Sequence, residues 1–153
     1  MRMPRAVWIA ALAALAAGLT LPAAAQFARP EEAVKYRQAT WSVLNQHFTR
    51  IGAMTRGRVP FDGRLALRDA EVVATLARLP SAAFGPGTDL PNDHARPEIW
   101  TETQRFRELG DRMVAETTRL LAVAQTQDLD RLKAAYGAAA NTCKECHDAY
   151  RSH

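Results

Sequence analysis

Apolar residues recur at helical spacing along this chain, and from residue 26 onward no stretch shows convincing strand alternation. A first helix is predicted to start after Pro30, with Glu31 and Glu32 in its first turn, where acidic side chains favour the helix dipole. Glycine and proline in residues 57–60 are expected to end it. Its apolar positions are Val34, Trp41, Leu44, Phe48 and Ile51.

Three further helices follow from the same pattern. The second is predicted to begin at about Asp62, a suitable N-cap, and to run to Pro80. The third begins near Pro97, and the fourth begins at about Asp128. The apolar positions of the third are Phe106, Leu109, Met113, Leu120 and Val123. Those of the fourth are Leu132, Tyr136, Ala139, Cys143, Cys146 and Tyr150.

Connection lengths then predict the fold. The first and third connections are short, whereas residues 80–97 form a long connection of the kind that is often functional. Four amphipathic helices joined in this way predict an all-α fold, an antiparallel up-down-up-down four-helix bundle. Gly137, two turns before Cys143, is explained equally well by a close backbone approach and by a tolerated imperfection.

The sequence Cys143-Lys144-Glu145-Cys146-His147 carries the most specific chemistry. On a helix, Cys143, Cys146 and His147 share one face, so one turn can hold a porphyrin edge and present an imidazole to its iron. A surface disulfide, a thioredoxin-like pair or half of a zinc site are the alternatives, but there is no βαβ setting and no second cysteine pair. The motif predicts one haem c per chain, covalently bound through Cys143 and Cys146, with His147 as the iron ligand.

Residues 1–25 have the pattern of a secretory signal peptide, which leaves residues 26–153 as the mature domain. Arg2 and Arg5 precede an apolar stretch that is too short for the roughly 20 residues of a membrane span. Small residues at 23–25 provide a cleavage site before Gln26. Because haem is attached to cysteines after export, we expect a periplasmic protein with no membrane span in its mature chain.

The leader also accounts for part of the charge. Removing 25 of 153 residues leaves 128, enough for one domain with its own core. The leader holds two arginines and no acidic residue, so a net charge of +4 falls to about +2. This balance gives no reason to expect nucleic-acid binding.

A sixth iron ligand would have to come from upstream of the motif. Residues 30–50 contain no methionine, and the interior position of that helix near the haem is Trp41, whose indole is not a normal iron ligand. His47 is rotated away from Trp41 and is expected to be a surface or packing residue. Met113 has the spacing of a core residue. Met54 and His94 lie near helix breaks, which makes each a weak candidate. Taken together, these positions favour a five-coordinate iron.

At this point the chain resembles the cytochrome c′ family over nearly all of its mature length. The matching segments are residues 26–31, 34–38, 84–88, 95–100 and 143–151. Cytochromes c′ are themselves a familiar example of the up-down-up-down bundle. The resemblance implies a homodimer with a high-spin haem and a vacant distal site, which binds NO and CO and binds O₂ poorly.

The resemblance also implies roles for four more residues. Arg37 and Gln38 would contact the haem, with Arg37 near its propionates, and Arg151 would lie over the proximal side, one turn past His147. Trp41 would occupy the distal position, where relatives often have leucine or phenylalanine. The larger ring is expected to crowd that site and to slow and weaken CO binding.

The leading hypothesis is therefore a five-coordinate haem protein that binds NO and CO and also transfers electrons to an unknown redox partner. The alternative is a six-coordinate electron-transfer cytochrome of the same bundle class, with a ligand such as Met113. No distal acid–base pair can be assigned, so we expect no catalytic residues and no enzymatic activity. Tyr36, Phe48 and Phe61 lie outside a single apolar stripe, which fits either a dimer interface or packing within one bundle.

Overall fold

The computed structural model of the protein describes residues 26–91 and 93–152. The predicted signal peptide, residues 1–25, lies outside the described residues. The elements are α2 (Pro30–Thr55), α3 (Gly63–Leu76), the 3-10 helix η1 (Pro80–Ala83), α4 (Glu98–Thr101), α5 (Thr103–Ala124) and α6 (Leu129–Tyr150). Extended pairing in this part of the chain is limited to one isolated bridge, between Ala95 and Arg151.

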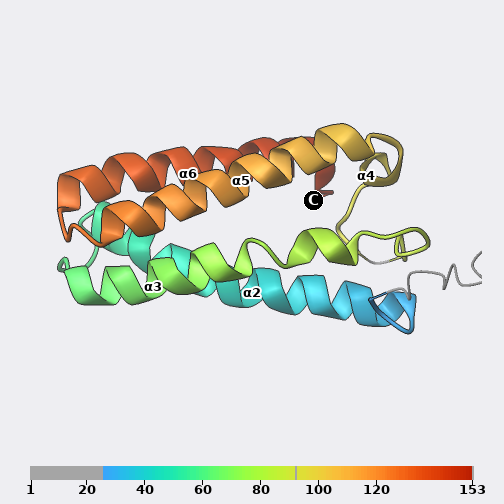
Figure 1. Cartoon of the computed structure of the whole chain (residues 1–153), viewed down its shortest axis with the longest axis horizontal. Coiled ribbons are helices and arrows are strands. Elements are labelled where there is room, and N and C mark those ends of the chain that lie inside the picture. The colour runs from blue at the N-terminus through green and yellow to red at the C-terminus, as the bar shows by residue number, and fades with distance from the viewer. Residues whose placement is uncertain (1–25, 92, 153) are drawn as a thin grey trace, which may run out of the picture.

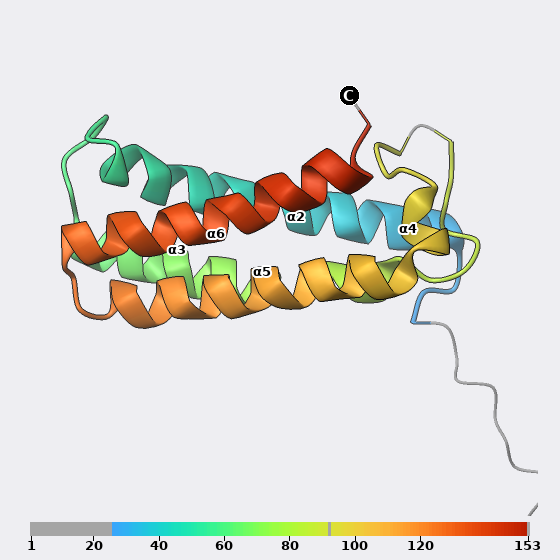
Figure 2. The same ribbon diagram turned by 90° about the horizontal axis from the view of Figure 1, so that it is seen from above.

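The four long helices form two layers, with α2 and α3 in one and α5 and α6 in the other, and each runs antiparallel to the next (Figure 1). This confirms the predicted antiparallel four-helix bundle. The α2–α3 and α5–α6 turns lie at one end, which we call the turn end (Figure 2). At the opposite end, the loop end, lie η1, α4, the long connection and the end of α6.

Local sequence signals set most helix boundaries as expected. Pro30 occupies the first turn of α2, and the chain after this helix turns through Gly57, whose φ is +67°. Asp62 and Asp128 cap α3 and α6, because each carboxylate accepts hydrogen bonds from the backbone N–H groups two and three residues further on. The predicted starts of the second and fourth helices are therefore confirmed.

Two boundaries differ from the prediction. α3 ends at Leu76 rather than at Pro80, because Pro80 has no N–H to donate to the Leu76 carbonyl four residues earlier; that carbonyl instead accepts a 3.1 Å hydrogen bond from the Leu79 N–H, and Pro80 opens η1. The third helix is divided into α4 and α5 at Glu102, whose φ and ψ are −104° and 42°. The Glu102 carboxylate accepts a 2.8 Å hydrogen bond from the Tyr150 hydroxyl, which ties this break to the end of α6.

The main core cluster draws buried residues from all four long helices, including Ile51, Val73, Leu120 and Leu132. Phe48 of α2 is buried in it and stacks on Tyr136 of α6 with a ring separation of 4.5 Å. Packing within one bundle, rather than a dimer contact, therefore accounts for Phe48.

Two glycines inside helices, Gly52 of α2 and Gly137 of α6, differ in surroundings. A β-carbon added at Gly52 would overlap the hydroxyl end of Tyr136, so α2 and α6 approach each other closely there. A β-carbon at Gly137 would meet no neighbouring atom among the described residues. Close approach thus explains Gly52, and of the two explanations for Gly137 a tolerated imperfection remains.

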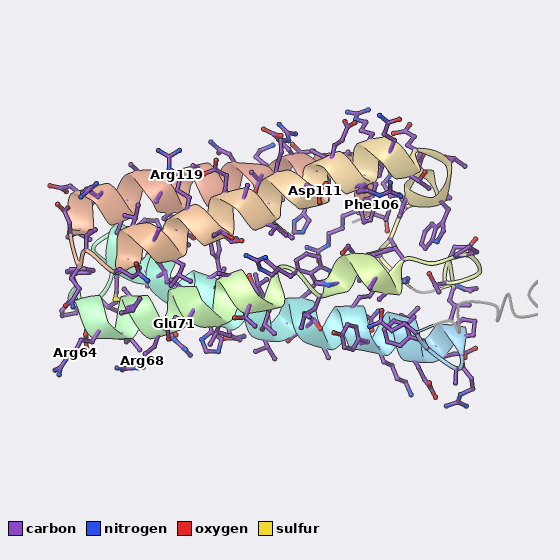
Figure 3. The ribbon with its side chains drawn as sticks, in the orientation of Figure 1. Arg64, Arg68, Glu71, Phe106, Asp111 and Arg119 are labelled. Carbon is purple, nitrogen blue, oxygen red and sulfur yellow. The ribbon has the colours of Figure 1, made fainter. Side chains whose placement is uncertain are left out.

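A second, smaller cluster fills the loop end. Ile99, Leu109 and Tyr150 are its buried members, and Phe106 packs edge-on against Tyr150 with a ring separation of 5.4 Å. Figure 3 labels Phe106 at this end, whereas the side chains of Arg64 and Arg68 on α3 point out from the bundle. None of the described helices is both long enough and apolar enough to cross a membrane.

Candidate functional site

The Cys-x-x-Cys-His motif lies on the last two turns of α6, at the boundary between the two core clusters. Ala139, one turn before Cys143, is buried in the main cluster, whereas Cys146 packs against the loop-end cluster. Both cysteines are free and half-buried, and His147 follows them with an exposed side chain. The helix therefore presents two thiols and an imidazole from adjacent turns where the apolar core is interrupted.

The surroundings of the three motif side chains shift their pKa values, and the shift at His147 suits an iron ligand. Burial raises the pKa of the Cys143 thiol, and burial together with the nearby Cys143 raises the pKa of Cys146 to about 11. Partial desolvation and the positive charge of Arg151 lower the pKa of His147 below its ordinary value. A neutral imidazole keeps a nitrogen lone pair free, which is the form that binds a metal.

Arg151 is the residue at which α6 ends. Its backbone is extended, with φ −114° and ψ 129°, and its N–H donates to the His147 carbonyl at 3.1 Å. The same residue forms the isolated bridge with Ala95 of the long connection. The exposed Arg151 side chain thus starts from a fixed backbone position one turn beyond the predicted iron ligand.

On α2, Arg37 and Trp41 lie on the helix face that also carries the buried Leu44 and Phe48. Trp41 is half-buried and packs against the main core cluster. Gln38 is exposed beside this face. The predicted distal residue is therefore an interior aromatic residue, as its spacing indicated.

Arg37 is almost fully buried, with 2 % exposure, and its guanidinium is directed into the long connection. It donates from Nε to Asp93 Oδ2 at 3.1 Å, from Nη1 to the Ala83 carbonyl at 2.6 Å and to Thr88 Oγ1 at 3.2 Å. Nη2 donates to the Thr88 carbonyl at 2.7 Å and to Asp93 Oδ2. These five bonds use all the N–H groups of an arginine, so a haem propionate would have to displace one of the acceptors.

Aromatic rings join the α2 part of the site to the α6 part. The guanidinium carbon of Arg37 lies 4.4 Å from the centre of the Phe84 ring and 5.7 Å from that of Trp100. Phe84, Trp100 and Cys146 all pack against the loop-end cluster. The structure thus brings Arg37 and Cys146 to the same cluster, although they are far apart in sequence.

Sequence reasoning missed the residues that hold Arg37. Asp93 and Thr88 were not singled out, and only the length and proline content of the connection between 80 and 97 suggested a function there. No periodic pattern marks which polar residue of a loop faces a buried arginine. The sequence signal that could have indicated these contacts is a glycine- and proline-rich loop together with an arginine at an interior helix position.

Three of the other four candidate ligands are engaged in helix packing. His47 Nδ1 lies 2.8 Å from Asp69 Oδ1 on α3, which confirms its prediction as a helix-packing histidine. Met54 and Met113 are buried in the main core cluster. His94 is exposed in the long connection, where its backbone carbonyl accepts a hydrogen bond from the N–H of residue 152.

Comparison with known proteins agrees with this geometry. The family described as Cytochrome C' matches residues 32–151. Cytochrome c' from Alcaligenes xylosoxydans xylosoxydans is 44% identical over 126 residues, which cover 82% of this chain and 98% of that protein.

Two solved variants of cytochrome c prime from Alcaligenes xylosoxidans are also similar. One is a nitric oxide complex, and the other has carbon monoxide bound. Each has a TM-score of 0.78 and 42% identity over 84% of this chain, covering 99% of the first and 100% of the second.

Proposed function

Because the chain belongs to the cytochrome c′ family and therefore carries haem c, we propose that it is a periplasmic haem protein that binds NO and CO at a five-coordinate iron. The observation that carries the proposal is the pairing of His147 beside two free cysteines on α6 with an interior tryptophan, Trp41, on α2. The NO and CO complexes of its relatives support the same ligands here. Electron transfer to a redox partner is the second part of the proposal.

Each residue of the site has a definite task. Cys143 and Cys146 would tether the porphyrin, and His147 would supply a nitrogen ligand to its iron. Bound haem supplies an iron that can change oxidation state and take a diatomic molecule. The bulk of Trp41 would limit which ligands reach the iron, and Arg37 holds the long connection in place. Gln38 binds Asp93 from the same helix.

Absorption and resonance Raman spectra of the reduced holoprotein, recorded with and without NO and CO, test this proposal. We expect a high-spin spectrum at rest that changes on adding either gas. Sharp low-spin α and β bands that CO does not alter would instead support the six-coordinate electron-transfer alternative. Met113→Leu would then identify the ligand by removing those bands.

The steric part of the proposal depends on Trp41. Trp41→Ala is expected to raise the CO association rate by about tenfold or more, which corresponds to a barrier lowered by about 1.4 kcal/mol. Trp41→Phe should give an intermediate rate. Stopped-flow mixing with CO measures both, and an unchanged rate in Trp41→Ala contradicts the steric account.

The periplasmic location rests on the predicted leader. Mass spectrometry of protein recovered from the periplasmic fraction should give a mature chain that starts at Gln26 and carries one covalent haem. Recovery of an uncleaved chain with the cytoplasmic fraction would contradict export.

A homodimer is also part of the proposal, through the outer face of α2 and α3. Val43 on α2 is 48% exposed. Val72 on the neighbouring α3 is half-exposed as well. Analytical ultracentrifugation should show a dimer that Val43→Glu dissociates. Val59→Glu, at a valine 46% exposed in the α2–α3 turn, is the matched control and should leave the dimer intact.

A further inference from the structure

A short segment of the long connection, residues 93–96, contacts both α2 and the end of α6. Asp93 binds α2 through its side chain. The residues that follow bind the backbone just beyond the haem motif. Residues 93–96 therefore connect α2, which carries Trp41, directly to α6, which carries His147.

On the α2 side, the Asp93 carboxylate is held through both of its oxygens. Oδ2 accepts hydrogen bonds from Arg37, and Oδ1 accepts one from Gln38 Nε2 at 3.2 Å. The side chains of Arg37 and Asp93 are only 2% and 8% exposed. A buried, hydrogen-bonded ion pair of this kind has strict geometry, so α2 determines where residue 93 lies.

On the α6 side, the segment is held through its backbone. The Arg96 N–H donates to the Tyr150 carbonyl at 2.9 Å, and the Ser152 N–H donates to the His94 carbonyl at 2.8 Å. These two bonds flank the bridge in which Ala95 faces residue 151. Residues 93–96 therefore fix the position of the backbone just after α6.

We propose that Asp93 is a positioning residue for the proximal side of the haem: by fixing segment 93–96 against α2, it sets the backbone of Arg151 beside His147. The inference rests on the proposed function, since it gives Arg151 its place near the iron ligand. Asp93 acts only through this segment and has no contact of its own with His147 in the structure.

The structural link is tested with Asp93→Asn in the holoprotein. The variant keeps the shape of the side chain but removes its charge and turns an N–H donor toward Arg37. We expect amide exchange at Arg96 and Ser152 to become about tenfold faster, because a hydrogen bond to a charged group is lost. Asp89→Asn, at an exposed aspartate of the same connection, is the control and should leave both rates unchanged.

A second variant tests the link from the other end without changing any charge. Ser152→Pro removes the N–H that binds His94, and the extended backbone of residue 151 already suits a residue before proline. Both variants also remove the 3.2 Å hydrogen bond that Ser152 Oγ donates to the His94 carbonyl, so Ser152→Ala, which keeps the N–H, is the matched control. We expect Ser152→Pro to lower the haem midpoint potential, because the positive charge of Arg151 is then held less firmly near the iron, and Ser152→Ala to leave it unchanged.

A double-mutant cycle with Arg151→Gln shows whether Asp93 acts through Arg151. The direct effect of removing the Asp93 charge on the midpoint potential is common to both backgrounds and cancels. The remaining change in midpoint potential should be present when residue 151 is arginine and absent when it is glutamine. If Asp93→Asn fails to fold, the cycle of Ser152→Pro with Arg151→Gln still tests whether the segment that Asp93 holds acts on the haem through Arg151.

Two results would overturn the inference: unchanged exchange at Arg96 in Asp93→Asn, or a zero coupling energy in the cycle. Both measurements are made without gas and do not require a vacant iron site. A wild-type protein that fails to bind NO and CO would therefore contradict the proposed function while leaving the inference on Asp93 intact.

Discussion

The two ends of the bundle are held together by different physical forces. At the turn end, apolar side chains of four helices interlock, and Phe48 stacks on Tyr136 where Gly52 lets α2 approach α6. At the loop end, a buried arginine and a set of backbone hydrogen bonds hold a long connection around a small aromatic cluster. The haem motif lies between the two.

The difference indicates what the cofactor does for the structure. Contacts of the turn end are complete within the protein, whereas Trp41, Cys143 and Cys146 are only half-buried at the boundary of the core. An attached porphyrin would cover apolar surface left there. We therefore expect the turn end to be a preformed scaffold and the loop end to owe part of its stability to the haem.

The largest effect is expected at the loop end, from Arg37→Leu. Removing the guanidinium leaves the Asp93 carboxylate buried without its partner, which should lower the free energy of unfolding of the holoprotein by about 3–5 kcal/mol. Urea denaturation measures the loss. Arg29→Leu, which breaks an exposed pair with Glu32, is the control and should cost less than about 1 kcal/mol. A loss as small as the control would mean that the buried pair does not hold the loop end.

The next largest effect belongs to the turn end. Leu120 is fully buried, so Leu120→Ala should cost about 3 kcal/mol through lost apolar contacts and a cavity. Leu79→Ala, at a side chain that is 37% exposed, should cost much less. Amide exchange tests whether the two ends are independent. Leu120→Ala should leave the exchange rate of the Arg96 N–H unchanged, and a faster rate there would show that the two ends are coupled.

Alanine substitutions at two glycines should change the stability of the protein by smaller amounts and in opposite directions. Gly52→Ala is expected to destabilise the protein by about 1–2 kcal/mol, because the new methyl group displaces the Tyr136 ring. Gly137→Ala has room for its methyl group and should stabilise α6 by up to about 1 kcal/mol. Thermal unfolding of both variants measures the difference, and equal shifts would contradict the close approach at Gly52.

The smallest effect concerns pH at the α2–α3 contact. Burial alone would raise the pKa of Asp69, but hydrogen bonds from Arg50 and His47 outweigh it, and the folded pKa is lowered. Because the folded pKa lies below the unfolded one, this stabilisation is present above the ordinary carboxyl range and is lost as pH falls through the folded pKa. Asp69→Asn should therefore be less stable than wild type at neutral pH, with a difference that shrinks in acid titrations.

Much of the fold was predictable because its signals are local. Asp62 and Asp128 cap helices where the sequence placed them, and Pro30 opens α2 as expected. The break at Glu102 was not predictable, since it depends on a hydrogen bond from Tyr150, 48 residues away. The early end of α3 follows from the missing N–H of Pro80, which leaves the Leu76 carbonyl without its helical partner, and this effect of a proline on the residue four positions earlier could have been predicted.

For the site, the spacing of Cys143, Cys146 and His147 was sufficient, because covalent haem attachment needs that pattern on one helix. The environment of Arg37 was not predictable, because its acceptors come from a loop whose path depends on the assembled bundle. The placement of Gln38, Trp41 and Arg151 against the haem itself stays a prediction.

The half-buried position of the two cysteines has a consequence for how the protein matures. α6 follows α2, α3 and α5 in the chain, and the sulfur atoms of Cys143 and Cys146 lie near its far end. A porphyrin reaches both sulfurs most easily while the end of α6 is still undocked. The thioether bonds should then form first, and residues 150–152 should dock onto the long connection in the last step of folding.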